Sequence, residues 1–269
     1  MKLNTVIGTI AAGLLFSGVA MGQAKIVIKG SDTLGAKMVP QLTAVYKAMG
    51  NATDFEIAAE GSSTAFTSLL EGTADIGMSS RDAKEGEKDS FTAKGKELVE
   101  HVAGIDMIAV VVNEGNSVKD LTTKQIEGIF TGEITDWSEL GGKKGAISVY
   151  TRNTSSGTYK SFQELAMNKR DYGSSTQKMA GNEAIASEVG KNINGIGYVG
   201  LAYAKNDGLL PVTVEGKGLD SPAEYPLSRK LYYYTVGQPE GEIGKFLTWA
   251  KTDETAQKVI EKVGFVSAK

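Results

Sequence analysis

Three short polar turns, each between an expected strand and an expected helix, constrain the fold of this chain more than any other feature. The strand at 26–29 ends in the turn 30–33, the strand at 55–59 in the turn 61–64, and the strand at 147–150 in the turn 151–158. Hydrophobic residues recur at steps of three and four after each turn, as in an amphipathic helix. This alternation predicts an α/β fold with parallel strands.

The composition of these turns is typical of anion binding. Their sequences are GSDT, GSST and, with Arg152, RNTSSGT. The start of a helix leaves backbone N–H groups unpaired, glycine allows a ligand to approach them closely, and hydroxyl groups add donors. One such turn could serve only as a helix cap. Three turns at strand ends, together with a guanidinium that can give two hydrogen bonds to an oxyanion, predict an anion site.

The composition disfavours several other kinds of site. The chain of 269 residues has no cysteine, one histidine (His101) and a formal net charge of −3. A thiolate metal site is therefore excluded, a histidine-based catalytic site is disfavoured, and nucleic acid is not an expected partner. Gly195–Gly200 matches G-x-G-x-x-G, but it reads as a strand with no helix opening on it, so we expect no dinucleotide. We predict no catalytic residue, no metal and no cofactor.

The N-terminus predicts export. Lys2 precedes an uncharged, apolar stretch at 7–20, and Gly22–Ala24 offers a small-x-small cleavage site. This pattern is typical of a cleaved signal peptide over 1–24, and the stretch is short for a membrane span, although an uncleaved anchor helix is the alternative. Because no cysteine is present to carry a lipid, we expect a periplasmic protein without a lipid anchor.

Four segments resemble the phosphate-binding proteins of ABC importers, within the type II periplasmic binding protein superfamily. They are 59–66 (AEGSSTAF), 74–84 (ADIGMSSRDAK), 151–162 (TRNTSSGTYKSF) and 193–204 (INGIGYVGLAYA). The resemblance implies two hinge-joined, Rossmann-like lobes with the ligand in the cleft between them. We expect residues 25–108 plus 206–269 in the first lobe and 109–205 in the second. It also implies a membrane permease as partner, and we expect a monomer.

The resemblance carries the phosphate contacts over to this sequence, and the turn residues suggest the rest. The expected ligand-binding residues are Thr33, Leu34, Ser62, Ser63, Ser80, Arg81, Arg152, Ser156, Gly157 and Thr158.

One position departs from the family pattern. Ser80 stands where typical phosphate binders have an aspartate, and Arg81 follows it. An aspartate can accept the proton of HPO₄²⁻ and repels sulfate, which has no proton to give. The choice between phosphate and sulfate, molybdate or tungstate therefore stays open here. Asp32 or Asp82 could act as the acceptor instead, and Arg81 could either attract the anion or be a surface charge beside Asp82.

The predicted function is a solute-binding protein that captures inorganic phosphate by hinge closure. An exported phosphatase is one alternative, but the serines of the turns have no evident base partner, which points to binding without turnover. A phosphate-sensing or interaction protein on the same scaffold is another alternative.

Overall fold

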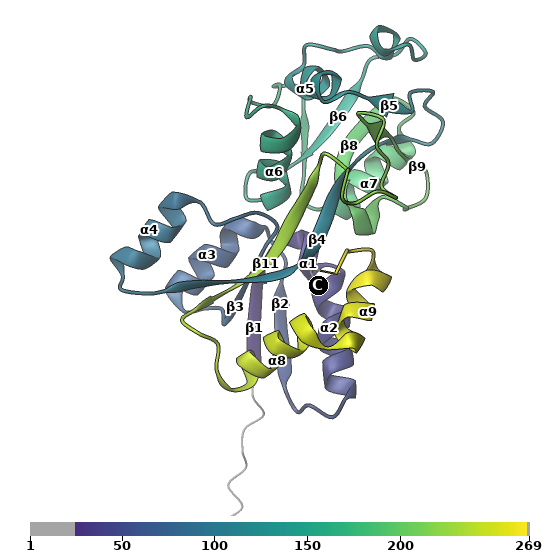
Figure 1. Ribbon diagram of the computed structural model, residues 1–269. Helices are drawn as coiled ribbons and strands as arrows, with labels where there is room; N and C mark the ends of the chain where they lie inside the picture. The colour runs from purple at the N-terminus through teal and green to yellow at the C-terminus, as the bar shows by residue number, and fades with distance from the viewer. Residues whose placement is uncertain (1–24, 268–269) are drawn as a thin grey trace, which may run out of the picture.

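The computed structural model describes residues 25–267, so the predicted signal peptide at 1–24 lies outside the described residues. Figure 1 shows two α/β lobes joined by two long strands, with the C-terminal helices folded back on the lobe that begins the chain. The main sheet runs through both lobes in the order β2-β1-β3-β11-β4-β8-β6-β7. This arrangement confirms the expected two-lobed α/β fold.

The first lobe contains three parallel strands and the helices that follow them. Its polar turns precede α1 and α3, as the sequence predicts. Apolar residues of this lobe enclose a core around Ile28, Leu34 and Ile76, and α3 and α4 pack in a second cluster around Phe66 and Phe91. The elements are β1 (Lys25–Gly30), α1 (Asp32–Gly35), α2 (Met38–Ala48), β2 (Asp54–Ala58), α3 (Ser62–Glu71), β3 (Ile76–Ser79), α4 (Glu85–Ala93), α8 (Gly241–Thr252) and α9 (Glu254–Val263).

The second lobe repeats the same order of strand, turn and helix around a separate core. Phe130, Phe162 and Tyr198 are buried at its centre, and the rings of Phe162 and Tyr198 are stacked. Its elements are β5 (Asp120–Leu121), α5 (Thr123–Thr131), the 3-10 helix Trp137–Leu140, β6 (Ser148–Arg152), α6 (Gly157–Ala166), β7 (Gln177–Met179), α7 (Asn182–Lys191), β8 (Gly195–Gly200), the 3-10 helix Leu201–Tyr203, β9 (Leu209–Pro211) and β10 (Thr213–Val214).

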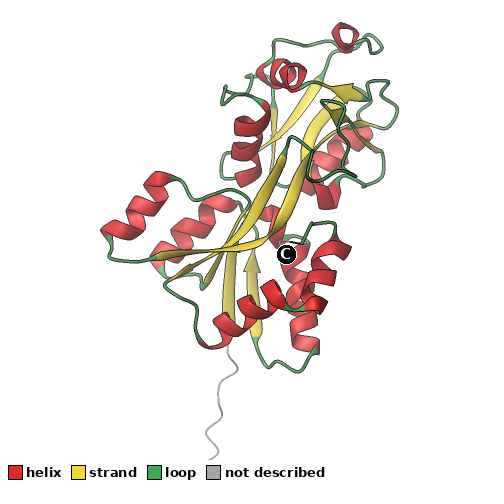
Figure 2. Ribbon diagram, in the orientation of Figure 1, coloured by secondary structure: helices red, strands yellow, loops and turns green. Residues whose placement is uncertain are grey.

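Two long strands connect the lobes (Figure 2). One is β4 (Leu98–Asn113), whose first part pairs with β11 (Ser228–Val236) and whose second part pairs with β8 and β9. Residues on either side of the crossing belong to different cores: Ala103 packs in the first lobe and Met107 in the second. The segment from Val212 to Leu227 also packs in the second core, before β11 returns the chain to the first lobe.

These strands contain two features that the sequence analysis considered, the glycine-rich motif and the single histidine. Gly195–Gly200 forms the buried strand β8 and is followed by a 3-10 turn, which confirms the prediction of a structural strand. His101 lies on β4 in the first lobe, where its Nε2 is 3.0 Å from Oγ1 of Thr235. Burial lowers the pKa of this imidazole.

Between Lys25 and Ser267, no helix is long and apolar enough to cross a membrane.

Candidate functional site

The polar turns of the two lobes meet at a cluster of four buried hydroxyl groups, which we call the hydroxyl cluster: Thr33, Ser62, Ser80 and Thr158. Oγ1 of Thr33 lies 3.0 Å from Oγ1 of Thr158, which comes from the other lobe. Oγ of Ser62 lies 3.2 Å from Oγ of Ser80. Each of these side chains is almost completely buried. The structure thus brings together residues that are up to 125 positions apart in the sequence.

Gly157 is the point at which the second lobe comes closest to this cluster. It is the first residue of α6, and a Cβ atom there would lie 2.3 Å from Oγ of Ser62 and 2.6 Å from Oγ of Ser80. Only a residue without a side chain fits this approach. The expected role of glycine in the R-x-x-x-S-G-T motif therefore has a steric reason.

The Gly157→Ala variant is expected to bind phosphate about tenfold more weakly, because the added methyl group pushes α6 away from Ser62. The melting temperature should also fall, because overpacking a buried contact is destabilising. Gly86→Ala is a matched control, because it also lies in a helix and has no atom within 4 Å of the added methyl. Isothermal titration of both variants checks this, and unchanged affinity of Gly157→Ala would contradict the close approach.

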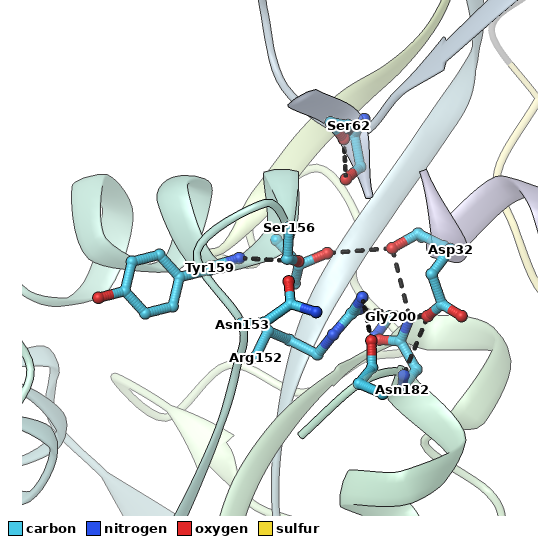
Figure 3. Close-up of polar contacts among 12 residues, drawn as sticks. Asp32, Ser62, Arg152, Asn153, Ser156, Tyr159, Asn182 and Gly200 are labelled. Atoms are coloured by element: carbon cyan, nitrogen blue, oxygen red, sulfur yellow. Dashed lines mark hydrogen bonds and ion pairs between the residues drawn. The ribbon is translucent and has the colours of Figure 1, made fainter. Parts of the chain in front are cut away.

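Arg152 ends β6 and is 1% exposed, although it carries a guanidinium. Its Nη2 donates to the carbonyl of Ala180 at 3.1 Å. Its Nη1 lies 3.2 Å from Oδ2 of Asp32 without hydrogen-bond geometry, so that Nε and Nη1 both lack a hydrogen-bond partner among the described residues. Figure 3 shows this side chain extended toward Asp32, Asn182 and Gly200. Buried donors without a partner are rare in proteins and call for a ligand or another explanation.

The electrostatics of Arg152 keep it charged. Burial lowers the pKa of the guanidinium, and the carboxylate of Asp32 opposes this effect. Because the ordinary pKa of arginine is above 12, the side chain remains a cation. It is therefore a charged donor held at the contact between the lobes.

Three other predicted residues lie beside the cluster. Ser156 caps α6, where its Oγ accepts a hydrogen bond from the backbone N–H of Tyr159 at 3.3 Å. The side chain of Leu34 is buried in the first core, which leaves only its backbone for a ligand. The backbone N–H of Ser63 donates across the interface to the carbonyl of Ser155 at 3.1 Å.

Arg81 is buried, but the structure does not bring its guanidinium into the hydroxyl cluster. Its Nη1 and Nη2 donate to the two carboxylate oxygens of Glu87 at 2.8 and 2.7 Å, and Nη1 also donates to the carbonyl of Asp82. Glu87 lies on α4, six residues along the chain. The salt bridge of Arg81 is thus with Glu87 rather than with the Asp82 carboxylate.

The sequence interpretation missed three polar residues of this region: Asp106, Asn182 and Arg229. Asp106 on β4 and Arg229 on β11 are direct cross-strand partners, and both are buried. Nη2 of Arg229 donates to Oδ2 of Asp106 at 2.8 Å. Their only signal in the sequence is a charged residue within or beside an apolar strand.

Asn182, the first residue of α7, joins the second lobe to Asp32. Its backbone N–H and its Nδ2 donate to Oδ2 of Asp32 at 3.0 and 2.7 Å, as Figure 3 shows. Its own Oδ1 accepts from the backbone N–H of Gly200 at 3.0 Å. Asn182 and Arg152, both from the second lobe, thus contact the carboxylate of Asp32.

A cleft of about 370 Å³ opens beside Arg229 and receives residues from both lobes and from β11. Cations outnumber acids on its walls, which raises the local concentration of anions. Its basic and hydroxyl residues are Arg81, Lys84, Lys160, Ser161, Ser228, Arg229, Lys230 and Tyr232. The residues from Lys25 to Ser267 include no group of three or more histidine, aspartate or glutamate side chains that could hold a metal ion.

Comparison with known proteins places this arrangement in a family. The PBP superfamily domain matches residues 17–254. The phosphate-binding protein PstS of Pseudomonas aeruginosa is 32% identical over 265 residues, which span 88% of this chain and 81% of that protein.

Solved structures agree with this relationship. A phosphate ABC transporter substrate-binding protein from Clostridium perfringens, solved with bound phosphate, superposes with a TM-score of 0.82 at 32% identity, covering 91% of this chain and all of the other. An ABC-type phosphate transport receptor from Vibrio cholerae gives a TM-score of 0.72 at 28% identity, covering 90% and 99%.

Proposed function

Because this chain belongs to the phosphate-binding proteins of the PBP superfamily, we propose that it captures inorganic phosphate between its lobes and delivers it to the permease of an ABC importer. The observation that carries the proposal is the buried guanidinium of Arg152. Its Nε and Nη1 have no hydrogen-bond partner among the described residues, and Nη1 lies 3.2 Å from the carboxylate of Asp32, the residue before Thr33 of the hydroxyl cluster. A tetrahedral oxyanion supplies the acceptors that these donors lack.

The ligand-binding residues divide between the lobes. The first lobe contributes Thr33 with the backbone of Leu34, Ser62 and Ser80, and these residues bind the anion first. The second lobe contributes Arg152, Ser156, Gly157 and Thr158, and it closes over the bound anion by a hinge movement of β4 and β11. Ser63 lies at the rim of this contact. Arg81 acts indirectly, because its salt bridge with Glu87 fixes the turn that presents Ser80.

The division of the chain follows from the packing of the two cores. We propose that the first lobe ends within β4 and resumes at Ser228, rather than at residue 206 as the sequence suggests. The basis is the packing of Val212 and Leu227 in the second core. The mature protein is proposed to act as a monomer in the periplasm after cleavage of the leader at 1–24.

The protein is a binding protein and not an enzyme, as its relatives are named for binding and transport. The presence of Ser80 in place of the family's aspartate favours one second candidate, which is the binding of another tetrahedral oxyanion such as sulfate. Molybdate and tungstate are larger versions of the same ligand class.

Isothermal titration calorimetry with phosphate, sulfate, arsenate, molybdate and tungstate tests the proposed function. Phosphate is expected to bind with a stoichiometry of one. Binding of sulfate alone would replace phosphate by the second candidate. If the folded protein binds none of the five anions, the proposed function is wrong and an interaction role takes its place.

A further inference from the structure

We propose that Arg229, held in place by Asp106, is a positioning residue that sets the ligand selectivity of the site. It occupies one lone pair of the Thr158 hydroxyl and so biases that hydroxyl to donate its proton toward the ligand. As a result, the site binds a fully ionised tetrahedral dianion such as sulfate together with phosphate. This inference rests on the proposed function and concerns the protonation state of the ligand that the site accepts.

Arg229 connects both lobes from the strand that joins them. Its Nη1 donates to the carbonyl of Ser80 in the first lobe at 3.0 Å. Its Nη2 donates to Oγ1 of Thr158 in the second lobe at 2.9 Å. Its Nε and Nη2 also donate to Oδ2 of Asp106. The guanidinium is therefore fixed by three different acceptors and is buried.

The hydrogen bond from Arg229 decides what Thr158 can do. A guanidinium has donors and no acceptor, so Oγ1 of Thr158 must be the acceptor of this bond. A hydroxyl has one proton and two lone pairs, so occupation of one lone pair by the N–H group favours donation on the other side and leaves a single lone pair as acceptor. There it meets Oγ1 of Thr33, at 3.0 Å, or a ligand that lies between the lobes.

Two further hydroxyl oxygens of the hydroxyl cluster also lie next to N–H donors. Oγ of Ser62 accepts from the backbone N–H of Ser80 at 3.0 Å. Oγ1 of Thr33 lies 3.4 Å from Nδ2 of Asn182, which is also a donor. Ser80 is the one member whose hydroxyl accepts no N–H group in the described structure. Three hydroxyls are thus biased to donate, and the Ser80 oxygen is the acceptor that no N–H group of the described residues occupies.

The two carboxylates of this region are engaged elsewhere. Oδ1 of Asp106 accepts from the backbone N–H of Leu201 at 2.9 Å, and Oδ2 accepts from Arg229. Oδ2 of Asp32 accepts from the backbone N–H of Asn182 and lies 3.2 Å from Nη1 of Arg152. Each carboxylate is thus next to a guanidinium that offsets its negative charge. A neutral serine oxygen can accept the proton of HPO₄²⁻, but it does not repel sulfate as a carboxylate does.

The test is the ratio of sulfate to phosphate affinity, measured by calorimetry at pH 8. The wild-type protein is expected to bind sulfate within about 100-fold of phosphate. In the double variant Arg229→Met/Asp106→Asn the formal charge of the pair stays zero, but the donor to Thr158 is lost. Both lone pairs of Thr158 are then free, and its hydroxyl more readily accepts the ligand's proton, so sulfate should lose about tenfold more affinity than phosphate, which is the value of roughly one hydrogen bond.

Arg170→Met is the control, because it also replaces an arginine by methionine but at a site of exposed ion pairs with Glu127 and Glu133, and it should keep the wild-type ratio. Equal loss of both anions in the double variant would mean that Arg229 is merely structural, and would overturn this inference while leaving phosphate binding intact. If the double variant does not fold, the wild-type protein still decides: sulfate bound more than about 1000-fold more weakly than phosphate overturns the inference. Wild-type protein that binds neither anion refutes the proposed function itself, and the inference with it.

Discussion

Replacing Arg152 with alanine is expected to weaken phosphate binding about 100-fold. The guanidinium is buried, and its Nε and Nη1 are unpaired in the described structure, so the ligand is the partner that satisfies them. A hydrogen bond to a charged group contributes about 1.5–3 kcal/mol. Asp32 also loses its cationic neighbour in this variant and leaves a negative charge near the anion.

Isothermal titration with phosphate measures the effect, and thermal unfolding shows whether the variant is folded. Arg170→Ala is a matched control, because Arg170 lies in the same lobe but forms exposed ion pairs with Glu127 and Glu133. Its affinity should equal that of the wild-type protein. Near-normal phosphate affinity of a folded Arg152→Ala protein would show that the ligand binds elsewhere.

Replacing Ser80 with aspartate is expected to raise the preference for phosphate over sulfate about 100-fold. The new carboxylate would lie next to Oγ of Ser62, where Ser80 Oγ is now 3.2 Å away. It can accept the proton of HPO₄²⁻ and repels sulfate. When sulfate is bound, the buried carboxylate has no hydrogen-bond partner and faces a negative charge, which costs roughly 3 kcal/mol of binding free energy. This cost corresponds to the expected change in the ratio of the two affinities.

The ratio of the two affinities is the quantity to measure. Gly157 lies so close to Ser80 that any larger side chain at position 80 is expected to lower the affinity for both anions. Ser80→Asn is the control for size without charge, and its ratio should stay near that of the wild-type protein. An unchanged ratio in Ser80→Asp would show that a different residue decides between the two anions.

The parts of the fold that depend on local sequence were predictable. The three polar turns precede α1, α3 and α6 as expected. Glycine, serine and threonine favour the start of a helix in the residues that immediately follow them. The strand assignment of Gly195–Gly200 was equally local. Each of these features can be recognised within about ten residues.

The remaining features depend on contacts between distant segments. Arg229 and Asp106 are 123 positions apart, and only the pairing of β4 with β11 makes them partners. Asn182 is 150 positions from Asp32. For Arg81 the sequence suggested Asp82 as neighbour, whereas the first turn of α4 brings Glu87 within reach. Periodicity does not contain this information, since it reports which face is apolar but not which strand lies opposite.

The cross-strand pairing of Arg229 with Asp106 also has a consequence for folding. Side chains alternate between the two faces of a strand. A slip of β11 by one residue relative to β4 would turn Arg229 to the opposite face of the sheet. The Asp106 carboxylate would then be buried without a cation. A buried charge that loses its partner costs several kcal/mol. The pair therefore penalises incorrect registers of the two strands that connect the lobes. Residues next to the ligand thus also ensure that the lobes are assembled in the correct alignment.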